Sequence, residues 1–166
     1  LKWKGKAVES VPEFGLMLTL PAEYRNVAYY GMGPGETYSD FTSGAHMGLF
    51  GFDAHTALQP YFNPQESGAR TGVQAAAVTD AAGFGLCLAG NGFMLSALPY
   101  TPHEVENARR QYELPPKVKT VVRCAKGQLG VAGDNTWGAG PHAEYHVALE
   151  KGETFRFTFG GMGGNG

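Results

Sequence analysis

Short segments of strand-forming residues recur along the chain, and each ends at a turn signal. Period-two alternation or brief apolar runs occupy residues 14–20, 26–31, 73–80, 84–90, 93–98, 119–125, 144–150 and 154–159. In the last segment Phe155, Phe157 and Phe159 alternate with polar residues, as a strand with one buried face requires. Gly, Pro, Asn and Asp separate the segments, a pattern typical of an antiparallel sandwich or barrel. The sequence therefore predicts an all-β protein, either an antiparallel sandwich or a barrel.

One segment interrupts the strands. Thr101 suits a helix N-cap, Pro102 suits the first helical position, and Glu104 completes a capping box. Apolar positions then recur with helical spacing as far as Tyr112, before a Pro-Pro pair. These features predict one short helix near residues 102–112.

Length and composition limit the classes of protein that fit. A chain of 166 residues with 43% hydrophobic content suits a single globular domain. Residues 160–166 are mostly glycine, so we expect a domain over 1–159 and a flexible tail over 160–166. The net charge of −2 gives no basic footprint for nucleic acid, and no apolar run approaches the roughly 20 residues that span a bilayer. We expect no nucleic-acid or membrane partner.

The first residue and the cysteines lead to three further expectations. The chain begins at Leu1 rather than Met, which suggests a piece of a longer polypeptide. We expect that parent in the cytoplasm, with export left open. Cys87 and Cys124 lie far apart among apolar neighbours and form no CxxC pair, so we expect two buried thiols.

Trp137 stands in a segment that suits neither a strand nor a helix. Gly133, Gly138 and further breakers surround it, and Asp134 and Asn135 favour turns. A large apolar ring on a loop either anchors the loop to the core or stays exposed to meet a ligand. The residues alone leave both interpretations open.

Two other motifs favour structural roles. The glycines of "GMGPGE" (31–36) do not open a helix, so we expect positive φ at a strand-to-loop corner rather than phosphate binding. His142, Glu144 and His146 share one face if residues 144–150 form a strand, a spacing open to metal ligation. We expect an exposed polar strand face there and no metal.

The segment "PYFNPQESGAR" (60–70) is dense in polar residues and breakers. A Glu66–Arg70 ion pair that pins a long loop is the favoured interpretation. The alternative is that Asn63, Gln65, Glu66 and Arg70 offer donors and acceptors to sugar hydroxyls. Neither this segment nor the rest of the chain has a recognisable catalytic motif, such as GxSxG or HExxH.

Six motifs taken in order support a resemblance to a known family. They are "FGLMLTLP", "YYGMGPGETYSD", "PYFNPQESGAR", "SALPYTPHEVENARRQYELPP", "LGVAGDNTWGAGPHAEY" and "FRFTF". Together they resemble the C-terminal small-chain domain of the β-galactosidases of glycoside hydrolase family 2. The resemblance runs from about Phe14 to Phe159.

The resemblance implies a galactose-mutarotase-like β-sandwich at the end of a multidomain enzyme that hydrolyses terminal non-reducing β-D-galactose residues. It places the catalytic glutamates, with Mg²⁺ and Na⁺, in a separate TIM-barrel domain, so we expect no catalytic residue and no cofactor in this chain. It also implies that Trp137, in Gly133-Asp134-Asn135-Thr136-Trp137, stacks on the sugar. Trp137, Asp134 and Asn135 are therefore the expected substrate-binding residues, with the other parent domains as partners and the isolated chain inactive.

Departures from the family pattern leave alternatives open. The family often has an acidic residue in place of Asn135 and a His in place of Tyr112, which puts those two roles in doubt. Family domains also run longer at the N-terminal side, so an edge or apolar face could be exposed and the fragment could self-associate. The rival functions are a stand-alone carbohydrate-binding module and a mutarotase-like aldose epimerase that uses His55, His142 and Glu66.

Overall fold

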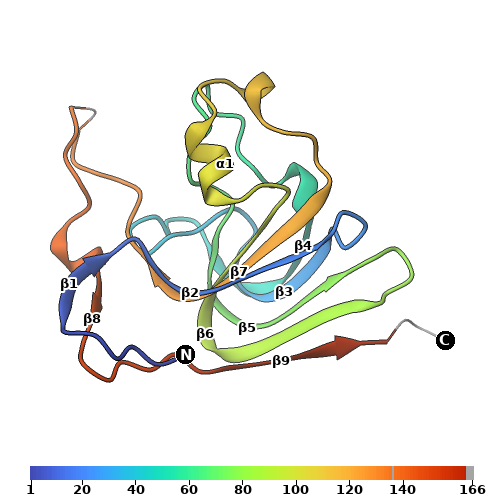
Figure 1. Ribbon diagram of the computed structural model, residues 1–166, viewed down its shortest axis with the longest axis horizontal. Helices are drawn as coiled ribbons and strands as arrows, with labels where there is room; N and C mark the ends of the chain where they lie inside the picture. Colours follow the sequence, from blue (N-terminus) through green and yellow to red (C-terminus); the bar gives the residue numbers. More distant parts are fainter. Residues whose placement is uncertain (136, 164–166) are drawn as a thin grey trace.

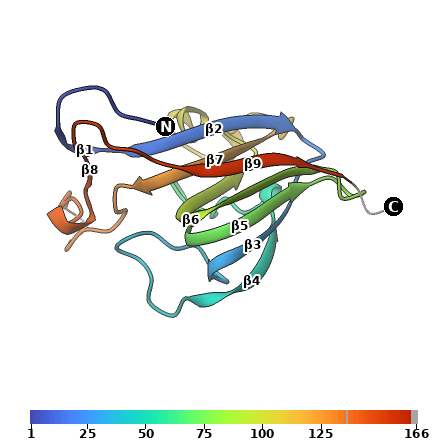
Figure 2. The same cartoon turned by 90° about the horizontal axis from the view of Figure 1, so that it is seen from below.

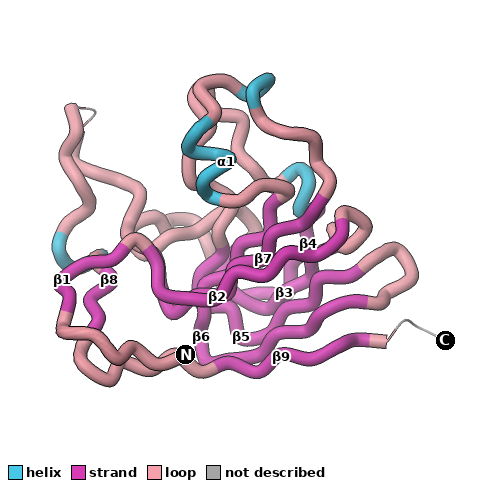
Figure 3. The backbone as a smooth tube through the Cα atoms, viewed as in Figure 1, coloured by secondary structure: helices cyan, strands magenta, loops and turns pink. Residues whose placement is uncertain are grey.

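The structure is a computed structural model that describes residues 1–135 and 137–163. Antiparallel strands dominate these residues, with one α helix and short 3₁₀ turns (Figures 1 and 3). The elements are β1 (Val8–Val11), β2 (Glu13–Pro21), β3 (Asn26–Gly33), β4 (His46–Asp53), η1 (Ala54–Thr56), β5 (Arg70–Thr79), β6 (Gly85–Leu98), α1 (Pro102–Asn107), η2 (Gln111–Glu113), β7 (Lys119–Gln128), η3 (Ala143–Tyr145), β8 (Val147–Leu149) and β9 (Phe157–Met162). None of the helices described is long and apolar enough to cross a membrane.

A seven-stranded sheet with a branch at β6 forms the body of the domain. Its strand order is β2-β7-β6-β5-β3-β4, and β9 pairs with β6 outside this path. The first part of β6, Gly85–Gly90, pairs with β9, and the later part, Met94–Leu98, pairs with β7. Gly92, between the two parts, has a φ of +72°. The sheet therefore branches at β6: β9 continues it from the first part of β6, and the β7–β2 pair continues it from the later part (Figure 2). A separate two-stranded sheet joins β1 to β8.

The core lies on one face of this sheet, here called the inner face. Alternation along β3 directs Val27 and Tyr29 to it. Strand β5 adds Val73 and Val78, which lie on either side of an irregularity in its register, and all four residues are at most 4% exposed. The later part of β6 adds Phe93 to the same cluster. Burial of each such side chain contributes roughly 1.5–3 kcal/mol, so the inner face holds the domain together.

The predicted all-β sandwich class with one short helix is confirmed, although several boundaries differ. The segments 84–90 and 93–98 form the single strand β6 rather than two strands. Strands β1 and β4 were not predicted. Two glycines interrupt the apolar residues of β4, "HMGLFGFD". Within 144–150 only Val147–Leu149, β8, forms a strand. Strand β9 continues through Met162, so residues 160–162 belong to a strand rather than a tail. Residues 164–166 of the expected tail lie outside the described residues.

The helix is shorter than expected. The capping box at Thr101 and Glu104 is present, and Val105 is buried. However, α1 ends at Asn107 because Ala108 already has an extended backbone, with φ −84° and ψ 122°. Tyr112, expected on the apolar face, is 84% exposed. The capping residues therefore predicted the start of the element correctly, whereas the helical spacing predicted its end wrongly.

The positions of the residues in the sheet correct two further expectations, one about the glycines of 31–36 and one about the cysteines. Gly31 and Gly33 lie within β3 and are not among the described residues with positive φ, so they do not form a corner. A side chain at Gly33 would overlap the ring of Phe50, which explains a glycine there. Cys124 is buried as expected, but Cys87 is exposed, because it points away from the core on β6.

Candidate functional site

The loop that carries Trp137 is a long hairpin between β7 and β8, the orange projection at the upper left of Figure 1. Two contacts fix its base. The backbone N–H of Leu129 donates to the carbonyl of Pro12 at 2.9 Å, and that of Ala132 donates to Asp40 Oδ2 at 2.7 Å. The hairpin therefore leaves the sheet from a defined point.

The two arms of the hairpin meet near its middle. A side chain on Gly133 would overlap the carbonyl oxygen of Ala139, so only glycine permits this approach. His142 Nε2 lies 2.9 Å from both carboxylate oxygens of Asp134, across the hairpin. This hydrogen bond raises the pKa of the His142 imidazole, since the carboxylate favours the charged form. Asp134 therefore joins the arms rather than simply forming a turn.

Trp137 lies at the end of the hairpin and is 93% exposed. Its backbone N–H donates to Asn135 Oδ1 at 2.8 Å, an Asx turn that needs no acidic residue at position 135. Gly138 follows with a φ of +100°, which favours glycine. Thr136 lies outside the described residues. The hairpin thus presents a flat apolar ring that makes almost no contact with its own domain.

The Glu66–Arg70 ion pair expected from the sequence is wrong. Arg70 begins β5 and is buried on the inner face, where it donates to Tyr29 Oη at 3.1 Å and lies 4.9 Å from the ring centre of Phe52. Glu66 instead accepts from Arg123 at 2.6 Å, on the opposite side of the sheet. The two residues are separated because the strand that begins at Arg70 turns its side chain away from the loop.

A buried cluster around Arg123 was not predicted. Arg123 is 5% exposed and also donates to Glu13 Oε2 at 2.7 Å, while Tyr38 Oη donates to Glu66 Oε1 at 3.0 Å. Burial raises the pKa of Glu13 and, with the charge of Glu66, that of Tyr38. The only signal in the sequence was a charged residue inside the apolar run "KTVVRCA".

This cluster borders a groove of about 610 Å³ between α1, the 64–66 loop and strands β2 and β7. Gln65 and Glu66 line it together with Arg123, so the structure brings two of the four proposed sugar-contacting residues to one groove. Asn63 instead accepts from Arg110 at 2.7 Å, and Arg70 lies on the inner face. The four residues therefore do not form one binding surface.

The candidate residues for an epimerase are also dispersed. His55 is buried and bonds to the carbonyl of Lys119 at 3.1 Å, and burial lowers its pKa. His142 bonds to Asp134 on the hairpin, and Glu66 bonds to Arg123. Within the described residues no hydrogen bond links any two of these three candidates, so no acid–base pair for one sugar is evident.

The 142–146 segment forms no polar strand face. Ala143–Tyr145 is a 3₁₀ turn, because its hydrogen bonds run from Tyr145 to His142 and from His146 to Ala143. His142 and His146 therefore do not lie on one strand face with Glu144. In the part of the chain that the structure describes, no group of three His, Cys, Asp or Glu side chains could hold a metal ion.

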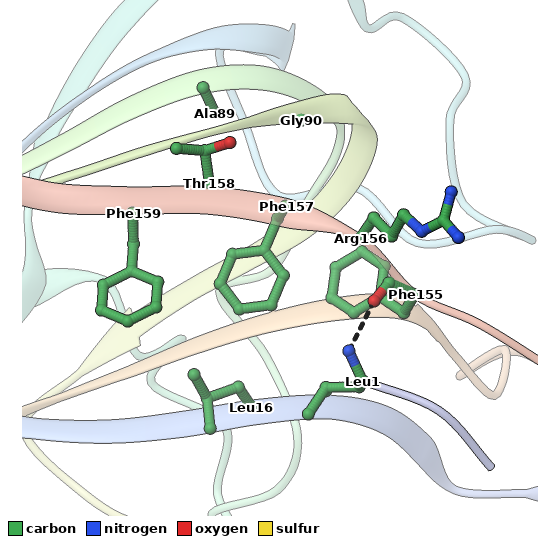
Figure 4. A pocket seen from close by; sticks show the side chains of 9 residues that line it. All are labelled: Leu1, Leu16, Ala89, Gly90, Phe155, Arg156, Phe157, Thr158 and Phe159. Atoms are coloured by element: carbon green, nitrogen blue, oxygen red, sulfur yellow. Dashed lines mark hydrogen bonds between the residues drawn. The ribbon is translucent and has the colours of Figure 1, made fainter.

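A second cavity, of about 620 Å³, lies between β9 and β2, beside Leu1 and the first part of β6. Figure 4 shows the rings of Phe157 and Phe159 extending from β9 toward Leu16 of β2, while Arg156 points elsewhere. Phe159 is 59% exposed even though it continues the inner face. This apolar wedge offers few polar groups to orient a sugar, in contrast to the hairpin and the groove.

The fold and the hairpin together define an all-β domain whose β7–β8 hairpin carries the highly exposed indole of Trp137. The family model "Beta galactosidase small chain" matches residues 1–160, and the chain belongs to this family as the small-chain domain of a β-galactosidase.

Three relatives show the same relationship. The chain is 39% identical to a β-galactosidase of Halalkalibacterium halodurans and 36% identical to one of Streptococcus thermophilus, over 93% and 95% of its own length and 15% of each relative. It is 29% identical to a β-galactosidase small subunit of Latilactobacillus sakei, over 89% of this chain and 50% of that protein. The chain thus spans a small part of the first two relatives and half of the third.

Proposed function

We propose that this chain is the C-terminal domain of a β-galactosidase that hydrolyses terminal non-reducing β-D-galactose residues, and that it supplies Trp137 as a stacking surface for the sugar. The reactive carboxylates, with Mg²⁺ and Na⁺, belong in this proposal to a separate barrel domain of the parent. The isolated chain is inactive. Domain assembly is its second role.

The exposure of Trp137 carries the proposal. A ring that is 93% exposed contributes little to the stability of its own domain, so its position calls for an external partner. Galactose presents an apolar C–H face, and an indole offers a flat, polarisable surface for it. The contacts at Asp134, Asn135 and Gly133 hold the hairpin in shape, so less conformational entropy is lost on binding.

The wider comparison supports the same assignment. The relatives of H. halodurans and S. thermophilus are called β-galactosidases, and most of their length lies outside the match. The L. sakei relative is a separate small subunit, so a domain of this kind can also reach its enzyme as a second chain. In our proposal the sugar site is formed, in either arrangement, together with polypeptide outside this chain.

The test uses the whole parent enzyme. Trp137→Ala removes the stacking surface and should raise KM for lactose about tenfold, which corresponds to roughly 1.4 kcal/mol of binding. Trp137→Phe should recover part of the loss. Trp3→Phe is the matched control, because Trp3 lies near the N-terminus and donates to its neighbour Lys6. An unchanged KM in Trp137→Ala would contradict the proposal.

A further inference from the structure

Five neighbouring strands have a second face, here called the outer face, that turns away from the core. The registered pairs of β4, β3, β5, β6 and β9 define it, and Figure 2 shows these strands side by side. One row across this face consists of Leu49, Tyr30, Ala75, Ala89 and Thr158. The next row runs from Gly51 to Gly160 and includes Cys87, and neither row contains a charged residue.

The outer face is apolar and open to solvent. Leu49 is 78% exposed and Tyr30 44% exposed, and Met47 adjoins them at 40%. The nearest charges lie at its margin, where Arg25 pairs with Asp53. An apolar surface five strands wide, with no charged residue on its two rows, is unusual for an isolated soluble domain and marks an interaction surface.

The shape and chemistry of this face select the kind of partner. It is a sheet surface with small side chains in its middle strands, and such a surface packs closely on another flat apolar layer at about 10 Å. Neither row carries a charge, and the hydroxyl groups on the two rows are those of Tyr30 and Thr158, so the face offers little to orient a sugar or a charged segment. The relative of H. halodurans matches this chain over only 15% of its length, so much polypeptide is present in such an enzyme to provide that layer.

We propose that the outer face is the surface on which an apolar sheet or helix from the rest of the parent β-galactosidase packs. This inference rests on the proposed function only in placing the chain within a larger enzyme, and it does not depend on Trp137. The hairpin and the outer face are then separate surfaces of the domain, one for the substrate and one for assembly.

Cys87 provides a native probe of this contact. Its thiol is exposed on the second row, where it donates to the carbonyl of Gly160 at 3.3 Å. Cys124 serves as an internal control, because it is 2% exposed and burial raises its pKa to about 12. N-ethylmaleimide at pH 8, followed by peptide mass spectrometry, should modify Cys87 and spare Cys124 in the isolated chain.

The same measurement on the native full-length parent decides the inference. Modification of Cys87 should be at least tenfold slower than in the isolated chain, and unfolding in urea should restore it. An equal rate in both proteins would overturn the proposal. Protection of Cys87 in the isolated chain that increases with its concentration would assign the face to a second copy, and would also overturn it.

A charge on the outer face gives an independent test. Ala75→Glu should leave the urea transition of the isolated chain unchanged, because Ala75 is exposed there, and should lower the thermal midpoint of the parent by several degrees. Ala81→Glu, in the exposed turn between β5 and β6, is the matched control and should change neither. A parent whose midpoint is the same with either variant would contradict the proposal. Since KM of the Trp137 variants is measured separately, failure here leaves the stacking proposal intact.

Discussion

Strand β7 and the hairpin that follows it contain two charged clusters with opposite exposure. Arg123 is 5% exposed and is held between Glu13 and Glu66. Asp134 and His142, on the hairpin, keep 73% and 58% of their side chains exposed. Buried charges depend on their partners, whereas exposed pairs contribute little to stability. The comparison therefore separates a cluster that stabilises the domain from one that shapes a surface for binding.

The largest expected effect concerns the buried cluster. Arg123→Ala leaves Glu13 and Glu66 without a cation, and it should lower the free energy of unfolding by about 3 kcal/mol. We take the lower end of the usual range because both carboxylates keep some contact with water. Urea denaturation of the isolated chain measures the loss. Lys126→Ala, which breaks the more exposed pair with Glu153, is the control and should cost well under 1 kcal/mol. A loss below 1 kcal/mol for Arg123→Ala would show that the buried cluster stabilises the domain no more than an exposed ion pair does.

A smaller effect is expected where the hairpin arms meet. Gly133→Ala places a methyl group against the carbonyl of Ala139, so the arms must separate, at a cost of about 1 kcal/mol. Gly140→Ala is the matched control, since a side chain there would meet nothing within 4 Å. In the parent, Gly133→Ala should raise KM for lactose several-fold while Gly140→Ala leaves it near the original value. Equal KM values for the two variants would show that the crossing does not position Trp137.

The contrast also shows what the sequence could and could not predict. Alternation predicted most strands, and capping chemistry predicted the start of α1, because both depend on neighbouring residues. The partner of Glu66 is Arg123, 57 residues away, and no local spacing encodes that distance. For the same reason Asp134 was expected to form a turn and to bind substrate, and its contact with His142 across the hairpin was not predicted. The breakers around Trp137 did predict a loop, since they act locally.

Trp137 should contribute little to the stability of its own domain. Its ring is 93% exposed, so Trp137→Ala should change the free energy of unfolding of the isolated chain by no more than about 0.5 kcal/mol. The same substitution should raise KM of the parent about tenfold. Urea denaturation with circular dichroism detection measures the first quantity. A loss of 2 kcal/mol or more would show that the ring anchors the domain.

The smallest expected effect is a pH dependence of the hairpin. The hydrogen bond and charge of Asp134 raise the pKa of His142 above its ordinary value of about 6.5, with a lesser contribution from the charge of Glu144. The Tyr145 ring, stacked 6.5 Å from the imidazole, is the other titratable group against it. Because the pKa is raised on folding, the interaction is fully present below about pH 6.5 and is lost as the pH rises through the folded value.

An NMR titration of the His142 imidazole tests whether Asp134 raises its pKa more than Glu144 does. Asp134→Asn should move the midpoint down toward about 6.5, and Glu144→Gln should move it less, since Asp134 accounts for most of the shift. In a Trp3→Phe background the fluorescence anisotropy of Trp137 should fall over the same pH range, as the arms lose their ionic contact and the ring moves more freely. A midpoint that Asp134→Asn leaves in place would show that the two side chains are not paired in solution, and Gly133 would then be the main constraint on the hairpin.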